Sequence, residues 1–286
     1  MRDWIEDHLL GKVEKPLRYQ GNEMNAVHKD WDSTTLRMVF AFPDVYEIGM
    51  SHLGLSILYH QANAMEDCLM ERVFTPWTDM EGLMRQHNIP LFSLESYRPV
   101  KEFHGIGFTL QYEMSYTNIL NMLDLAEIPL RRRDRSDEDP LVFMGGPCAY
   151  NPEPLADFAD VILIGEGEEM NIEFYQVWAD HLKRNHGKMN KQELLDEVVK
   201  IPGVYIPQFY DVTYDDRTTE VQYISTMDLS EAGWQIMTKS IDDLGNEESA
   251  APYIVESWGE DEYEEAISSP YGSAITTLES IFKSIA

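Results

Sequence analysis

Two short apolar runs, each ending in glycine, constrain the fold of this chain more than any other feature. The first is Leu141-Val-Phe-Met-Gly-Gly-Pro-Cys148, and the second is Asp160-Val-Ile-Leu-Ile-Gly-Glu-Gly-Glu168. Apolar runs of this length between turn residues are typical of strands that are buried on both faces of a parallel sheet. Ligands of open α/β sheets bind outside the carboxyl ends of such strands. The two runs therefore predict a parallel sheet and the edge at which a binding site would lie.

From residue 36 onwards, strand-like segments alternate with segments whose apolar residues recur at helical spacing. Further strands are predicted at 36–42, 72–75, 90–94 and 105–110. Helices are predicted at 51–64, 79–87, 117–125 and 168–184. Strands separated by helices imply right-handed βαβ crossovers. We therefore expect an α/β fold with a doubly wound, mainly parallel sheet and flanking helices.

The pattern divides the chain into four parts. Residues 1–35 are expected to form an N-terminal arm that packs on an α/β domain at 36–200. Residues 201–227 are expected to form a short β extension or linker, with β segments at 203–207 and 210–214. The remainder, 228–286, is rich in carboxylates and poor in apolar runs, which is typical of a disordered tail.

Charge and composition exclude several classes of function. The chain has 22 Lys and Arg against 51 Asp and Glu, a net charge of −29, which repels nucleic-acid phosphates. No apolar run approaches the roughly 20 residues that span a bilayer, and the N-terminus lacks the features of a signal peptide. We therefore predict a cytoplasmic protein that binds neither nucleic acid nor membranes. Its two cysteines, Cys68 and Cys148, are too few for an iron–sulfur cluster or a cysteine zinc site.

Four separated motifs occur in a fixed order along the chain. They are Phe42-Pro-Asp-Val-Tyr-Glu-Ile-Gly-Met-Ser-His-Leu-Gly54, Gly107-Phe-Thr-Leu-Gln-Tyr-Glu-Met-Ser-Tyr-Thr-Asn118, Gly145-Gly-Pro-Cys-Ala-Tyr-Asn-Pro-Glu-Pro154 and Ile164-Gly-Glu-Gly-Glu168. Tyr19, Gly21, Glu23 and Asn25 precede them. Over about residues 15–225, this set resembles the N-terminal, cobalamin-binding-like domain of radical S-adenosylmethionine (radical SAM) proteins. A lone Gly-x-Gly would carry little weight.

The resemblance implies a Rossmann-like or flavodoxin-like domain that precedes a TIM-barrel-like catalytic core. In that family the core binds an iron–sulfur cluster through a Cys-x-x-x-Cys-x-x-Cys motif, which this sequence lacks. The chain is thus expected to be a stand-alone or truncated accessory domain, or one half of a broken gene. Its expected partner is a radical SAM catalytic core, in cis or in trans. No catalytic residue and no iron–sulfur cluster are assigned to this chain.

Cobalamin is the cofactor that the resemblance implies, without a histidine ligand to cobalt. Cobalamin domains commonly carry Asp-x-His-x-x-Gly after the first strand. Here that loop reads Asp44-Val-Tyr-Glu-Ile-Gly49, so Tyr46 stands in the histidine position. Tyr46, Glu47 and Gly49 are therefore candidate cofactor-binding residues from this loop.

The later motifs supply the other candidates: Gln111, Ser115, Gly145, Gly146, Gly165 and Gly167. The glycines could admit a ligand against bare backbone, or could serve turns that need positive φ. Ser115, Thr117 and Asn118 could bind a cofactor tail, although helix capping is favoured. His52 has no partner at metal-ligand spacing, which favours a structural role.

Three functions remain open on the sequence alone. The first is an accessory domain that presents cobalamin to a catalytic core. The second is a cofactor-free scaffold that contacts such a core. The third is a flavodoxin-like domain that binds a flavin.

Overall fold

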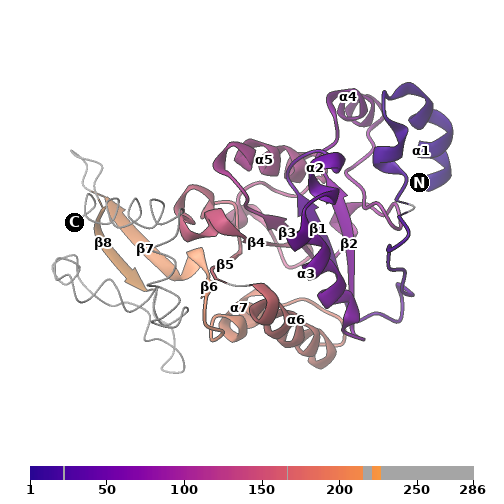
Figure 1. Ribbon diagram of the computed structural model, residues 1–286. Helices are drawn as coiled ribbons and strands as arrows, with labels where there is room; N and C mark the ends of the chain where they lie inside the picture. The colour runs from indigo at the N-terminus through magenta and orange to yellow at the C-terminus, as the bar shows by residue number, and fades with distance from the viewer. Residues whose placement is uncertain (22, 166, 215–220, 227–286) are drawn as a thin grey trace. The chain divides into compact units, whose positions relative to one another are not determined.

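The computed structural model describes residues 1–21, 23–165, 167–214 and 221–226 (Figure 1). The chain divides into two units, Met1–Tyr205 and Ile206–Ala286. The predicted acidic tail, 228–286, lies outside the described residues. All the candidate site residues belong to the first unit.

A single six-stranded sheet forms the centre of the first unit. Its strands are β1 (Leu36–Phe42), β2 (Cys68–Phe74), β3 (Gly105–Thr109), β4 (Leu141–Gly145), β5 (Val161–Leu163) and β6 (Val204–Tyr205). The spatial order is β2-β1-β3-β4-β5-β6. The first five strands are parallel, and β6 runs antiparallel to β5. The order 2-1-3-4-5 is that of flavodoxin-like folds, so the predicted α/β fold is confirmed.

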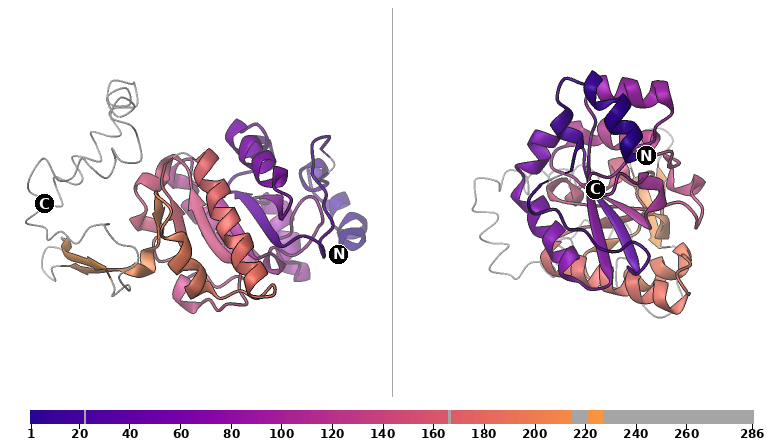
Figure 2. Two further views of the ribbon diagram at one scale, coloured as in Figure 1. Left: turned by 90° about the horizontal axis from the view of Figure 1, so that it is seen from below. Right: turned by 90° about the vertical axis from the view of Figure 1, so that its right-hand side faces the viewer.

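Helices cover both faces of this sheet, as the end-on view in Figure 2 shows. They are α1 (Arg2–His8), α2 (Tyr46–Met50), α3 (Leu53–Ala64), α4 (Thr78–His87), α5 (Tyr116–Leu125), α6 (Gly167–Arg184) and α7 (Lys191–Val198). Helices α3 and α6 contact each other on one face. Helices α4 and α5 lie on the other face, where their buried methionines join the main apolar core.

The strands are apolar on both faces because both faces are covered. On the α6 face, the aromatic rings of Phe143, Phe174 and Trp178 pack together. Gly105 and Gly107 of β3 lie beneath this cluster. A Cβ at Gly105 would overlap Trp178, and one at Gly107 would overlap Phe143. These two glycines therefore make room for the aromatic cluster.

The predicted strand at 90–94 is wrong. The segment makes only an isolated antiparallel bridge between Phe92 and Pro99. It instead covers the free edge of β2: the Leu94 amide donates to the Arg72 carbonyl (2.9 Å), and the Glu95 carboxylate accepts from the Arg72 amide (2.8 Å). Apolar residues are needed at this edge, but a regular strand is not.

Three other elements differ from the sequence prediction. The strand expected at 72–75 begins at Cys68, because Cys68 to Glu71 are buried and pair with β1. Helix α7 was not predicted. The segment expected as an extension after residue 200 supplies β6, which completes the sheet of the first unit. In the second unit, β7 (Tyr210–Tyr214) pairs antiparallel with β8 (Val221–Thr226).

Candidate functional site

A cavity of about 170 Å³ opens at the carboxyl ends of β1, β3, β4 and β5, next to the first turns of α3 and α6. Most of its wall is apolar and includes Phe40, Leu55, Phe143 and Leu163. Polar side chains also reach it, from His52, Thr109, Gln111, Glu168 and Asn171. The cavity thus lies at the edge where doubly wound sheets bind ligands.

Five of the residues predicted from the sequence meet at this cavity: Gln111, Gly145, Gly146, Gly165 and Gly167. They come from the ends of three strands and the start of α6, so the fold joins motifs that lie more than fifty residues apart. The prediction that the two glycine-ended strands would mark one crevice agrees with this arrangement.

The glycines serve different purposes. Gly146 and Gly165 have φ values of +114° and +121°, which side chains rarely tolerate. A Cβ on Gly146 would lie 3.0 Å from the Leu110 backbone, so this glycine is required within the protein itself. A Cβ on Gly165 would meet no described atom within 4 Å. Gly145 lies at the end of β4, where a Cβ would fit 3.4 Å from Leu163.

The polar side chains of the cavity differ in which of their atoms already form hydrogen bonds within the protein. The Gln111 amide Nε2 donates to Thr109 Oγ1 at 2.6 Å. His52 precedes α3, and its Nδ1 accepts a hydrogen bond from the Leu55 amide at 3.1 Å. In a neutral imidazole this places the ring proton on Nε2. His52 therefore caps α3 through Nδ1, which supports the structural role that the sequence favours for it.

Asn171 was missed by the sequence analysis. It lines the cavity from the second turn of α6 and is only 7% exposed. A signal was present in the sequence: Asn171 shares helical spacing with Phe174, Tyr175 and Trp178, all of which are buried. A polar residue on such an apolar stripe indicates a buried polar group.

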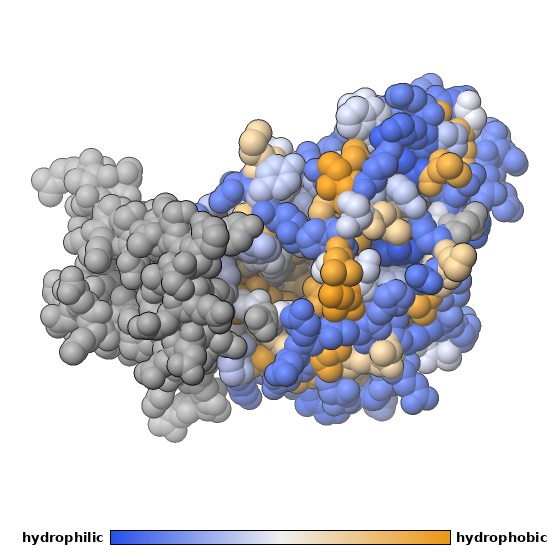
Figure 3. All heavy atoms as spheres, in the orientation of Figure 1, coloured by the Kyte–Doolittle hydropathy of each residue, from blue (hydrophilic) through white to orange (hydrophobic). Residues whose placement is uncertain are grey.

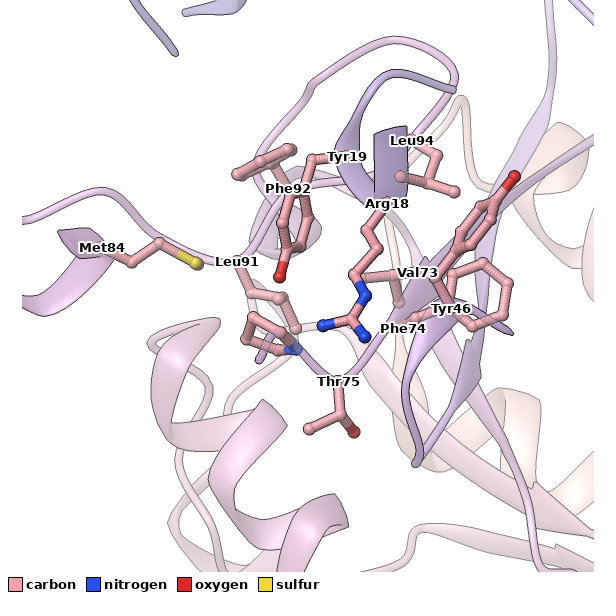
Figure 4. Close-up of a pocket in the computed structure, with 11 residues that line it drawn as sticks. Arg18, Tyr19, Tyr46, Val73, Phe74, Thr75, Met84, Leu91, Phe92 and Leu94 are labelled. Carbon is pink, nitrogen blue, oxygen red and sulfur yellow. The ribbon is translucent and has the colours of Figure 1, made fainter. Parts of the chain in front are cut away.

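Tyr46 and Glu47 do not reach the cavity. Tyr46 donates from its hydroxyl to Glu23 Oε1 at 2.7 Å, and burial together with this carboxylate raises its pKa to about 12. Glu47 forms ion pairs with Arg18 (2.9 Å) and Lys15 (3.0 Å), and the Arg18 hydrogen bond lowers its pKa to about 2. Figure 4 shows Tyr46 beside Phe74 in a separate hollow of about 20 Å³. That space is enough for about one water molecule.

Gly49 and Ser115 also lie away from the cavity, and both have structural explanations. Gly49 is buried, and a Cβ there would overlap the Phe74 ring. Ser115 stands at the N-cap position of α5, but its hydroxyl donates back to the Tyr112 carbonyl at 2.8 Å. The favoured capping hydrogen bond at Ser115 is therefore wrong. Asn118, in the same motif, ties α5 to the end of β1 by donating to the Pro43 carbonyl at 2.9 Å.

The N-terminal motif residues hold the chain against the sheet edge. The Tyr19 hydroxyl accepts from the Trp77 amide at 3.0 Å. Glu23 pairs with Arg72 of β2 at 3.1 Å, and Arg72 also pairs with the buried Glu95 at 2.7 Å. These residues of the motif set therefore act in packing and ion pairing.

A larger hollow of about 440 Å³ lies beside the first half of β2. Its charged groups already have partners within the protein. Arg98 pairs with Glu102 at 3.0 Å and covers the Trp31 ring at 4.1 Å. Lys29 donates to two backbone carbonyls at 2.6 Å. The smaller cavity at the strand ends is the better candidate, because its position follows from the fold and its glycines from the sequence motifs.

Within the described ranges, no three His, Cys, Asp or Glu side chains gather into a group that could hold a metal ion. None of the helices that the structure describes is long and apolar enough to cross a membrane. The first turn of α6 carries Glu168 and Glu169. These carboxylates disfavour an anionic ligand group at that end of the cavity.

Comparison with known proteins gives two matches. Residues 54–207, more than half of the chain, match the family described as radical SAM proteins, N-terminal. An uncharacterized protein of Methanocaldococcus jannaschii is 26% identical over 132 residues. The matched stretch covers 46% of this chain and 24% of that relative. No solved structure matches the chain.

Proposed function

Because the chain belongs to the family of radical SAM N-terminal domains, we propose that it is an accessory domain that holds cobalamin for a radical SAM catalytic core. The observation that carries this proposal is the glycine-lined cavity at the carboxyl ends of β1, β3, β4 and β5. Five residues from the family-like motifs converge there, at the ligand-binding edge of a doubly wound sheet.

The size of the cavity favours one kind of ligand. An apolar cavity of about 150 Å³ can hold a benzene ring, whereas drug-sized ligands occupy roughly 300–1,000 Å³. A cavity of about 170 Å³ therefore suits one small aromatic group of a ligand whose bulk stays outside. Cobalamin has two such parts, because a flexible tail joins its small nucleotide base to the much larger corrin ring. The three fused rings of a flavin fit less well.

The residues of the cavity fit such a group. The bare backbone at Gly145 and Gly165 leaves space that side chains would enter. Phe40 and Phe143 offer apolar contacts to a ring, while His52 and Asn171 offer polar ones. Cobalamin, when bound, supplies cobalt-centred radical chemistry. The part of this chain is to bind and orient the cofactor.

The geometry supports cobalamin without a protein ligand to cobalt. Tyr46, in the sequence position of the usual histidine, is held away by Glu23. His52 stands at the cavity, but its Nδ1 is engaged by the helix cap and its Nε2 carries the proton.

The face around the cavity is suited to a protein partner. Apolar side chains gather over α2 and α3 (Figure 3). The exposed large apolar residues of these two helices are Ile48 (49%), Leu53 (73%) and Ile57 (38%). Met114, in the loop after β3, is 84% exposed. We expect the catalytic core to dock here, and the same face supports the second candidate, a cofactor-free scaffold.

Cobalamin binding is tested by anaerobic titration of the protein with hydroxocobalamin, followed by absorbance and thermal shift. Gly145→Val should block binding, because its Cβ fits but its two methyl groups enter the cavity. Gly82→Val is the matched control, since Gly82 is exposed on α4 and does not line the cavity. Cob(II)alamin bound without histidine should show no nitrogen splitting in its electron paramagnetic resonance spectrum.

The outcomes separate the candidates. No spectral change and no thermal shift with the unaltered protein would eliminate the cofactor and leave the scaffold. A response to flavin mononucleotide in place of cobalamin would favour the flavodoxin-like alternative. Equal binding by the Gly145→Val and Gly82→Val variants would place the cobalamin elsewhere on the protein.

A further inference from the structure

A buried carboxylate at the free edge of the sheet has no cationic partner. Glu71 of β2 is only 3% exposed. Its Oε2 accepts hydrogen bonds from the Ser96 hydroxyl (2.7 Å) and the Ser96 amide (3.3 Å), both of which are neutral. Within the described ranges, no Lys, Arg or His side chain forms an ion pair with Glu71, whereas the buried Glu95 pairs with Arg72. Buried charges are normally paired, so a cation from outside the chain would complete this site.

The hollow beside β2 gives such a cation access to Glu71. Glu71 lines this space of about 440 Å³, which lies within the roughly 300–1,000 Å³ typical of small-molecule sites. Trp31, Leu69 and Pro99 contribute apolar wall. Glu71 belongs to no group of three His, Cys, Asp or Glu side chains, among the described residues, that could hold a metal ion. The cation expected beside Glu71 is therefore an organic ammonium group.

Positive side chains line the same hollow. The Arg98 guanidinium lies over the Trp31 ring at 4.1 Å, and its Nη1 donates to Glu102 at 3.0 Å. Arginine has five N–H donors, so Arg98 can also bind a second carboxylate. Lys29 uses two of its three donors on backbone carbonyls, at 2.6 Å each. Because these cations would repel a ligand that is only positive, the hollow favours a ligand that carries both charges.

The backbone holds the two kinds of charge close together. Ser96 binds the Glu71 carboxylate, and Arg98 follows two residues later. Between them, Tyr97 has a φ of +59°, which side chains rarely adopt. Its hydroxyl fixes this turn by donating to the Tyr19 carbonyl at 2.5 Å. Strain of this kind persists only where surrounding contacts impose it, and it is common at ligand sites.

We propose that the hollow beside β2 binds a free amino acid with an apolar side chain, whose ammonium group pairs with Glu71 and whose carboxylate pairs with Arg98. The apolar side chain packs against Leu69 and Pro99. This site is separate from the cavity at the strand ends and does not depend on cobalamin.

The first test is calorimetric titration of the full chain with three related probes. L-phenylalanine carries both charges, phenethylamine lacks the carboxylate, and 3-phenylpropionate lacks the ammonium group. L-phenylalanine should bind roughly tenfold or more tightly than either of the others, because each loses one charged hydrogen-bonding partner. Equal binding of the three probes would overturn the proposal, as would the absence of heat from L-phenylalanine, L-leucine and L-methionine.

The second test assigns each charge to its residue. Glu71→Gln keeps an oxygen for Ser96 and should weaken L-phenylalanine and phenethylamine roughly tenfold or more, while 3-phenylpropionate binds as before. Arg98→Met keeps an apolar stem on Trp31 and should weaken L-phenylalanine and 3-phenylpropionate, but not phenethylamine. Glu138→Gln is the matched control, because Glu138 is exposed and does not line the hollow. A variant at Glu71 or Arg98 that weakens all three probes equally, or none, would overturn the proposal.

Discussion

Gly21 gives the most direct test of whether the N-terminal motif residues serve packing. Its φ is +60°, and a Cβ would overlap the Leu94 carbonyl oxygen and lie 2.6 Å from the carbonyl carbon. The left-handed conformation costs alanine about 1–2 kcal/mol, and overpacking against a backbone that cannot turn aside adds about 1–3 kcal/mol. We therefore expect Gly21→Ala to lower the free energy of unfolding by about 2–5 kcal/mol, a large share of the roughly 5–15 kcal/mol of a typical domain.

Urea unfolding followed by tryptophan fluorescence measures this loss. Gly11→Ala is the matched control, because Gly11 has no positive φ and a Cβ there would meet nothing within 4 Å. The control should stay within about 0.5 kcal/mol of the unaltered protein, with the same dependence on urea. If the two variants differ by less than about 1 kcal/mol, the close approach of Gly21 to Leu94 does not exist in solution.

Three further predictions concern buried groups. Burial and a neighbouring guanidinium lower the pKa of His104 from 6.5 to about 4. The stability that the neutral His104 contributes above pH 6.5 is therefore lost as the pH falls to 4, a loss of about 3 kcal/mol at ~1.36 kcal/mol per pKa unit. Urea unfolding of His104→Gln at different pH values should lack this loss. Glu23→Gln removes a charged partner of Arg72 and should lower the free energy of unfolding by about 2 kcal/mol; an unchanged value would make that ion pair dispensable. Gly107→Ala would overlap Phe143 and should cost about 1–3 kcal/mol, partly restored when Phe143→Leu is added.

The sheet was predictable because its strands are buried on both faces. Leu36–Phe42 and Leu141–Gly145 are apolar at nearly every position, and each lies between turn residues. The segment at 90–94 has the same apolar character but covers a sheet edge. Composition alone cannot distinguish pairing along a strand from packing against its edge.

The candidate site was predictable in part. Gly145, Gly146, Gly165 and Gly167 lie at strand or helix ends, and parallel strands bring such ends to one edge. Tyr46 was placed with them because it occupies the histidine position of the cobalamin motif in the loop after β1. Its hydroxyl instead turns to Glu23, which is 23 residues earlier in the chain. The local sequence around Tyr46 contains nothing that indicates Glu23 as its hydrogen-bond partner.

The sequence by itself determined the doubly wound sheet, the edge that carries the cavity and the family to which the chain belongs. These follow from periodicity and from glycines at strand ends, which are properties of short segments. Only the tertiary structure decided which candidates share the cavity, that His52 caps α3 and where Asn171 is buried. Each of those depends on contacts between residues distant in the chain, and such contacts are set by packing. The two glycine-ended runs thus locate the site, while the side chains that could select its ligand come from the elements folded around them.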